Sequence, residues 1–197
     1  MISFEKKRVE FSFFGDRNYV DVTTISKELF KKISVPMFQL KKIEFSILKT
    51  VSYNGLFTLS KIKPIADYTV AVSFQYLDEN YFGFVEDRDD LINQRFDEIP
   101  YVIENYFLLE GQSMTITKPL NDDFVYNYMK MGKELLVKNS IGLNPRVAKY
   151  QFDFVPENAD YGHLSMKIKL EGKSKFYRLD CYFKDSHFGY VIVKVLS

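Results

Sequence analysis

The chain has 197 residues, of which 46% are apolar, so it is long and apolar enough to bury a core, and it does not have the composition of a disordered protein. Its 27 basic and 26 acidic residues nearly balance, whereas nucleic-acid-binding proteins usually carry a basic excess, so we expect no nucleic-acid partner. The single cysteine, the absence of an apolar signal core at the N-terminus and the absence of any window of transmembrane length predict a soluble, cytoplasmic protein without a membrane partner.

The N-terminal part of the chain has the pattern of one strand, one short helix and four further strands. Alternating apolar and polar residues predict a strand over 2–14, and Thr23 or Thr24 is expected to cap a helix that ends near Ile33. Ile25, Leu29 and Ile33 are spaced by four residues, so we expect them to form one apolar face of this helix. The pair Asn54-Gly55 is typical of a two-residue hairpin turn, which we expect between the first two of the four strands. The four predicted strands cover 42–53, 56–62, 68–77 and 81–86.

The middle of the chain is predicted to be a helical linker that joins two halves. Two aspartates, Asp89 and Asp90, would favour a helix N-terminus there through the helix dipole. We therefore expect a first half over 1–88, a helical linker over 89–111 and a second half over 112–197.

The second half repeats the order of elements of the first. A short strand is predicted at 114–117, followed by a helix with Asn121 as its N-cap. The residues of this helix that recur at helical spacing predict one buried apolar face: Phe124, Tyr128, Met131 and Leu135. The remaining segment, 147–196, alternates in the manner of four strands, and we expect it to form an antiparallel meander.

The second helix carries a resemblance to a known family. Its stretch from Asn121 through Tyr128 to Gly142-Leu143 resembles the helix of 4-hydroxybenzoyl-CoA-type thioesterases, in which an Asn-rich start leads through aromatic residues to a closing Gly-Leu. In the first half, 15–20 lies where that family has its acidic loop. The resemblance implies an α+β double hotdog, that is, two strand-helix-four-strand units whose antiparallel sheets wrap central helices.

The same resemblance implies a chemistry and a set of residues. Hotdog thioesterases use a carboxylate near the start of the helix as nucleophile or base, and amides of the helix N-terminus polarise the thioester carbonyl. The candidate catalytic residues are Asp16, Asp122 and Asp123, and the candidate substrate-binding residues are Asn18, Asn121 and Tyr128. The aspartates and Asn121 also have a purely structural interpretation, as a turn residue, a helix cap or a complement to the helix dipole.

Other chemistries are disfavoured by the residue types available. The two histidines, His163 and His187, are expected at strand ends rather than before a helix, which argues against a hotdog dehydratase. The position of Cys181 among alternating apolar residues predicts a buried structural thiol rather than a nucleophile paired with His187. With no standard metal-ligand spacing and no glycine-rich phosphate loop, we expect neither a metal nor a cofactor.

Two functions from different classes remain open. The first is the binding or hydrolysis of an acyl thioester of coenzyme A or of acyl carrier protein, by a thioesterase-like hydrolase if the protein is an enzyme. It predicts an apolar tunnel beside the helix at 121–138, and a homodimer is one assembly that it allows. The second is a non-catalytic protein-interaction module, such as an immunity, antitoxin-like or phage-encoded binding protein, which the 19 Phe and 14 Tyr favour because aromatic residues anchor interfaces.

Overall fold

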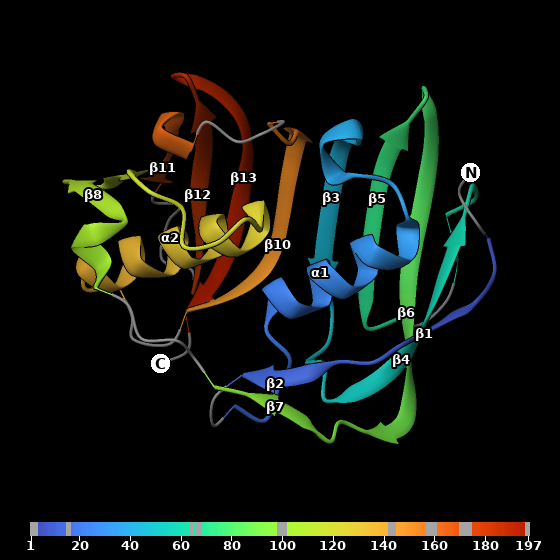
Figure 1. Ribbon diagram of the computed structural model, residues 1–197. Helices are drawn as coiled ribbons and strands as arrows, with labels where there is room; N and C mark the ends of the chain where they lie inside the picture. The colour runs from blue at the N-terminus through green and yellow to red at the C-terminus, as the bar shows by residue number, and fades with distance from the viewer. Residues whose placement is uncertain are drawn as a thin grey trace. The chain divides into compact units, whose positions relative to one another are not determined.

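The chain forms two compact units, each with a long α-helix lying against an antiparallel sheet (Figure 1). The computed structural model describes residues 4–14, 17–63, 65, 68–97, 102–141, 145–156, 161–169 and 175–195. The first unit spans Met1–Ile99 and the second Pro100–Ser197. The predicted α+β class is therefore confirmed. Among the described residues, no helix is long and apolar enough to cross a bilayer.

The first unit is built around helix α1 (Val22–Ile33), which contacts strands β1 and β4. The predicted apolar face of α1 is confirmed, because Ile25, Leu29 and Ile33 are all buried. Its sheet has the strand order β1-β4-β6-β5-β3, and a short parallel pair, β2 and β7, accompanies it. The elements are β1 (Lys7–Val9), β2 (Ser12–Phe14), the 3₁₀ turn η1 (Met37–Gln39), β3 (Lys41–Ile47), β4 (Tyr53–Ser60), β5 (Val70–Tyr76), β6 (Glu79–Leu91) and β7 (Gln94–Phe96).

The second unit is built around helix α2 (Phe124–Lys138), and its sheet has the order β10-β13-β12-β11-β9-β8. The strand predicted at 114–117 corresponds to β9, and the remaining strands follow the predicted order along the chain. The elements are the 3₁₀ turn η2 (Ile103–Asn105), β8 (Phe107–Glu110), β9 (Ser113–Ile116), β10 (Pro145–Phe154), the 3₁₀ turn η3 (Tyr161–His163), β11 (Leu164–Lys169), β12 (Phe176–Phe183) and β13 (Ser186–Val195).

Aromatic packing fills the space between α2 and its sheet. The ring of Tyr128 lies 5.0 Å from that of Phe124, 5.9 Å from that of Phe152 and 5.8 Å from that of Phe188. Further along the helix, a Cβ at Gly132 would lie 2.9 Å from Leu179 Cδ1, so glycine lets the helix approach the sheet closely. The helix face predicted from spacing is confirmed, because its four members are all buried: Phe124, Tyr128, Met131 and Leu135.

The two units share their order of elements along the chain but not their order of strands across the sheet. In the second unit, β11, β12 and β13 form a meander, while β10 pairs with β13. The predicted four-strand meander is therefore wrong for β10. In the first unit, β6 lies between β4 and β5, so β4 does not neighbour the next strand along the chain. Alternation predicts which face of a strand is buried, but it carries no information about which strand lies beside it.

The predicted hairpin turn at Asn54-Gly55 is wrong, because both residues lie inside β4. Strand β4 pairs with β1 and β6 rather than with β3, so there is no β3–β4 hairpin to turn. The Asn54 side chain instead joins separate segments. Its Oδ1 accepts a hydrogen bond from Phe11 N at 2.8 Å, and its Nδ2 donates to Leu91 O at 3.1 Å. Asn54, a residue type that is common in turns, is here a buried side chain that links Phe11 to Leu91.

The predicted helical linker over 89–111 is also wrong for the residues described there. Strand β6 continues to Leu91, then β7, η2 and β8 follow, with no α-helix among the described residues of this stretch. Pairing with β4 extends β6 through this acidic segment, with Leu91 opposite Tyr53, and the Asp90 carboxylate lies 3.6 Å from the Arg8 guanidinium. Sheet pairing has overridden the local preference of the aspartates. The two units divide at 99/100, inside this stretch, and the predicted boundaries at 88 and 112 stay predictions.

Candidate functional site

The N-terminus of α2 is closed by Asp123. This residue has extended backbone angles, with φ −86° and ψ 112°, and its Oδ1 accepts a hydrogen bond from Tyr126 N at 2.9 Å. That geometry is the N-cap arrangement, in which a side-chain oxygen satisfies an amide of the first turn. The N-cap predicted at Asn121 is therefore wrong by two residues. The carboxylate of Asp123, a candidate catalytic group, is half-buried and engaged with the main chain.

Two asparagines hold the loop that enters α2. Asn127 is fully buried, and its Nδ2 donates to the carbonyls of Asn121 and Asp123, both at 2.7 Å. Its Oδ1 accepts from Leu120 N at 2.5 Å, while Asn121 Oδ1 accepts from Asp123 N at 2.9 Å. Asn127 was missed from the sequence, although a polar residue between the buried Phe124 and Tyr128 was an available signal. These bonds fix the position of the residues just before the helix.

Asp122 occupies a different environment from Asp123, its neighbour. It is exposed and comes directly before the cap, while Asp123 is half-buried. Of the two candidate carboxylates at α2, Asp122 is the one that faces solvent. Its catalytic role stays a prediction.

The N-terminus of α1 has a buried carboxylate, Asp21, that was not predicted from the sequence. Asp21, rather than Thr23 or Thr24, is the N-cap, and it is only 6% exposed. Its Oδ1 accepts from Thr23 N at 3.0 Å and from Thr23 Oγ1 at 2.9 Å, and its Oδ2 lies 3.2 Å from Arg17 Nη1. An aspartate two residues before a threonine at a helix start was the signal that could have found it.

The other candidates of the first unit lie just before this cap. Asp16 lies outside the described residues. Asn18 is exposed, and its carbonyl accepts a hydrogen bond from Ser52 Oγ at 3.4 Å. The substrate-binding role of Asn18 and the catalytic role of Asp16 stay predictions.

Tyr128, predicted to bind substrate, is a core residue of the second unit. It has no exposed surface, and its hydroxyl lies within hydrogen-bonding distance of two sheet carbonyls, Ser165 O at 3.0 Å and Tyr182 O at 3.1 Å. Burial raises the pKa of Tyr128 well above its ordinary value near 10, because the phenolate would lose its hydration. The hydroxyl thus anchors α2 to the sheet, and a role in substrate binding stays a prediction.

The prediction of a buried structural thiol at Cys181 is confirmed. The side chain is fully buried, and this burial raises the pKa of the thiol well above its ordinary value. His187 was considered as the base that could pair with a Cys181 nucleophile. Its Nε2 lies 3.6 Å from Asp180 Oδ1, and its ring packs edge-on against Tyr182. Among the described residues, no group of three or more His, Cys, Asp or Glu side chains is placed to hold a metal.

We expect the buried Cys181 to make stability fall at alkaline pH. In the unfolded chain the thiol ionises near pH 9, whereas in the folded protein it keeps its proton to higher pH. The unfolded state therefore loses a proton first, and the free energy of unfolding falls by about 1.4 kcal/mol per pH unit above that point. Urea unfolding of wild type and of Cys181→Ala at pH 8 and pH 10 measures this fall in the free energy of unfolding. Between the two pH values, the variant should lose less stability than wild type. Equal losses in the two proteins would contradict the prediction.

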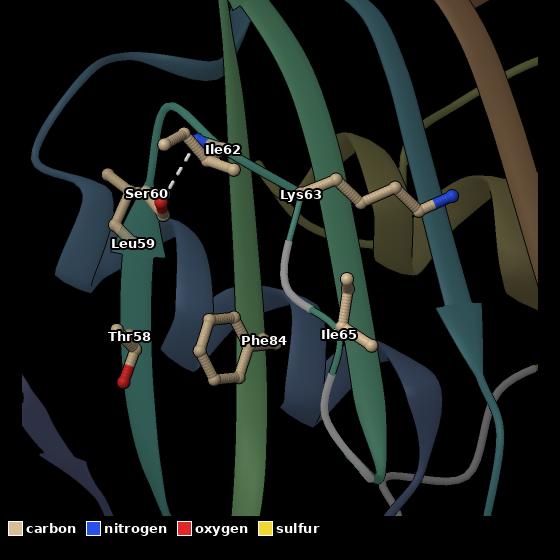
Figure 2. Close-up of a pocket in the computed structure, with 7 residues that line it drawn as sticks. All are labelled: Thr58, Leu59, Ser60, Ile62, Lys63, Ile65 and Phe84. Carbon is tan, nitrogen blue, oxygen red and sulfur yellow. Dashed lines mark hydrogen bonds between the residues drawn. The ribbon is translucent and has the colours of Figure 1, made fainter.

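Among the described residues, two surface hollows lie in the first unit, and the apolar tunnel expected beside α2 stays a prediction. One, of about 320 Å³, is lined by Gln39, Lys41, Gln75, Tyr76, Leu77 and Asp78. The other, of about 470 Å³, is lined by Thr58, Leu59, Ser60, Ile62, Lys63, Ile65 and Phe84 (Figure 2). Beside α2, the space under the helix is occupied by the aromatic rings around Tyr128.

Comparison with known proteins finds a match in structure but not in sequence. No family model matches the chain, and no curated protein sequence matches it. A tesB protein from Mycobacterium avium subspecies paratuberculosis is 10% identical, with a TM-score of 0.50 over 98% of this chain and 96% of its own. A protein assigned as an oleoyl thioesterase from Lactobacillus plantarum is 9% identical, with a TM-score of 0.51 over 98% and 96%.

A third structure extends the same likeness. A protein assigned as a thioesterase II from Thermobifida fusca is 6% identical, with a TM-score of 0.50 over 100% of this chain and 98% of its own. These likenesses run through both units and are likenesses of fold. The fold is a double hotdog, as the resemblance in the α2 segment implied.

Proposed function

We propose that this protein binds an acyl thioester of coenzyme A or of acyl carrier protein and hydrolyses it. The observation that supports this best is the likeness to thioesterase structures over nearly the whole chain, with TM-scores of 0.50 and 0.51. Hydrolysis by a carboxylate needs no cofactor, which agrees with the residue types of the chain.

In the proposed reaction, an exposed carboxylate works beside a helix N-terminus. Asp122 would accept a proton from a water molecule, whose oxygen attacks the thioester carbonyl carbon. The carbon–sulfur bond then breaks, and the departing thiolate takes up the proton, which gives a carboxylic acid and a free thiol. The partial positive charge at the start of α2 would stabilise the oxyanion that forms on the way.

The other candidate residues have supporting roles in the proposed reaction. Asn121 lies next to Asp122 and holds its backbone, since its Oδ1 accepts from Asp123 N at 2.9 Å. We propose Asn121 and Asn18 as groups that contact the substrate near the two helix N-termini. Asp16 would be the corresponding acid of the first unit, and Tyr128 would act only through the packing of α2.

Asp122→Asn is expected to lower thioester hydrolysis by about 10²–10⁴-fold, the usual contribution of a general base. The assay follows free thiol released from acyl-CoAs of different chain length with a chromogenic disulfide. Its background should be low, because the single cysteine of the chain is fully buried. Substrate affinity should change far less than the rate, since an amide keeps the size and polarity of the side chain.

Two further variants give this test its controls. Asp185→Asn replaces an exposed aspartate in the turn between β12 and β13, and it should leave the rate unchanged. Asp123→Asn should also stay near the wild-type rate, because asparagine caps a helix about as well as aspartate does. Full activity in Asp122→Asn, or a loss in Asp123→Asn alone, would overturn the assignment of Asp122.

A non-catalytic interaction protein is the alternative function, and exposed apolar side chains favour it. Ile62, Leu77 and Leu91 are 79%, 77% and 68% exposed, so several large apolar groups face solvent in the first unit. This function predicts one stoichiometric protein partner in a pull-down from the native host, together with no hydrolysis of any acyl-CoA. A pull-down without such a partner would count against it.

A further inference from the structure

The sheet of the first unit has a buried aromatic residue on the face that α1 does not cover. Along β4, Phe57 and Leu59 are buried and alternate with the half-buried Thr58 and Ser60. Phe84 of β6 lies opposite Thr58 in the register, so the two side chains share a face. Figure 2 shows this face in front of the sheet and a helix behind it. Phe84 is nevertheless only 8% exposed, which means that another part of the chain shields it.

Tyr68, which lies just before β5, contributes to this shielding, and Ile62 lies just beyond the end of β4. Ser60 Oγ accepts a hydrogen bond from Ile62 N at 3.0 Å, which turns the chain as it leaves the strand (Figure 2). Further along, the Tyr68 ring lies 6.1 Å from the Phe84 ring. Phe84 and Ile62 both line the hollow of about 470 Å³, which we call the outer hollow. Its volume falls in the range of small-molecule sites.

The rim of the outer hollow has an unusual combination of exposed groups. Ile62 and Ile65 are 79% and 105% exposed, so two branched apolar side chains stand almost entirely in water. Covering them would be favourable, because burial of apolar surface is the main driving force of ligand binding in such sites. Between them in sequence stands Lys63, for which the described part of the chain offers no ion-pair partner. The nearby Lys61, in contrast, is paired with Glu79 at 2.6 Å.

We propose that the outer hollow binds a small aliphatic carboxylate. The alkyl chain would lie against Ile62, Ile65 and Phe84, and the carboxylate would pair with the ammonium group of Lys63 at the rim. The walls supply apolar contact, and Lys63 supplies the charge that selects an anionic end group. This site lies on the sheet of the first unit, it uses none of the residues assigned to thioester hydrolysis, and it does not depend on that activity.

Titration calorimetry on the full chain tests the proposal, with decanoate, hexanoate, acetate and decanol as ligands below their aggregation concentrations. Decanoate should bind, and affinity should fall by up to about fourfold for each methylene removed, the factor that corresponds to about 0.8 kcal/mol. Acetate should not bind measurably. Decanol should bind more weakly than decanoate, and Lys63→Met should bring the two ligands to similar affinities.

Two matched variants locate the site. Ile65→Glu should weaken decanoate binding at least tenfold without loss of folding, because the residue is fully exposed. Leu108→Glu changes an exposed leucine of β8 in the second unit, and it should bind like wild type. Equal affinities of these two variants, or no heat of binding with decanoate, would overturn the proposal. Asp122→Asn should bind decanoate normally, so the outcome for the outer hollow is separate from the outcome for hydrolysis.

Discussion

Tyr128→Ala is expected to lower the free energy of unfolding of the second unit by about 3–5 kcal/mol, the usual cost of removing a large buried aromatic side chain. The ring is fully buried and contacts Phe124, Phe152 and Phe188, so its removal leaves a cavity that rigid neighbours cannot fill. The substitution also leaves the carbonyls of Ser165 and Tyr182 without this donor. Urea unfolding followed by circular dichroism measures the effect.

Tyr128→Phe is the matched control, because it keeps the ring and removes only the hydroxyl. It should cost about 1–3 kcal/mol, the penalty for leaving buried acceptors without a donor. If Tyr128 acts only through packing, this variant should hydrolyse thioesters with unchanged affinity for them. A weaker affinity in a fully folded Tyr128→Phe protein would favour the substrate-binding role. A cost below about 1 kcal/mol for Tyr128→Ala would contradict the packing account.

The helix faces could be predicted from the sequence because helical periodicity is local. In α1, Ile25, Leu29 and Ile33 recur every four residues, and one face of a helix must bury them. In α2 the same spacing identified Phe124 and Tyr128 before any tertiary contact was known. These two faces fix where each helix meets its sheet, whereas the double hotdog was inferred from the order of the elements and from the resemblance in the α2 segment.

Strand neighbours could not be predicted, because pairing joins residues far apart in the chain. Nothing in β10 indicates that its partner is β13, the last strand, rather than β11, the next one. The acidic end of β6 has the composition of a helix start, yet its partner β4 keeps it extended to Leu91. Asn54-Gly55 has the composition of a turn, yet Asn54 is used to hold Phe11. In each case a distant partner decided the structure against a local preference.

The start of each helix could be located from the sequence to within a few residues, but the residue that caps it could not. Several residues near each helix start could serve as the cap, and only the backbone angles decide which does. At α2 that residue is Asp123, whose half-buried carboxylate accepts a hydrogen bond from Tyr126 N, whereas Asp122 is exposed. At α1 it is Asp21, which is buried beside Arg17. The structure thus shows that Asp123 is the helix cap and that Asp122 is exposed. Because the two aspartates differ in this way, variants of each can be compared to test the proposal for Asp122.

Gly189→Ala is expected to destabilise the second unit by about 3 kcal/mol, at the upper end of the range for overpacked positions. Gly189 lies in β13 between Phe152 of β10 and Cys181 of β12, and a Cβ there would stand 2.1 Å from Gln151 O and 2.9 Å from Phe152 Cδ1. The backbone oxygen cannot move aside without breaking the β10–β13 pairing, so the strands must separate. Gly111→Ala is the control, since that residue has a φ of +60° but nothing near its added methyl group, and it should cost only about 1 kcal/mol. Equal unfolding midpoints for the two variants would contradict close approach of the strands as the reason for glycine in β13.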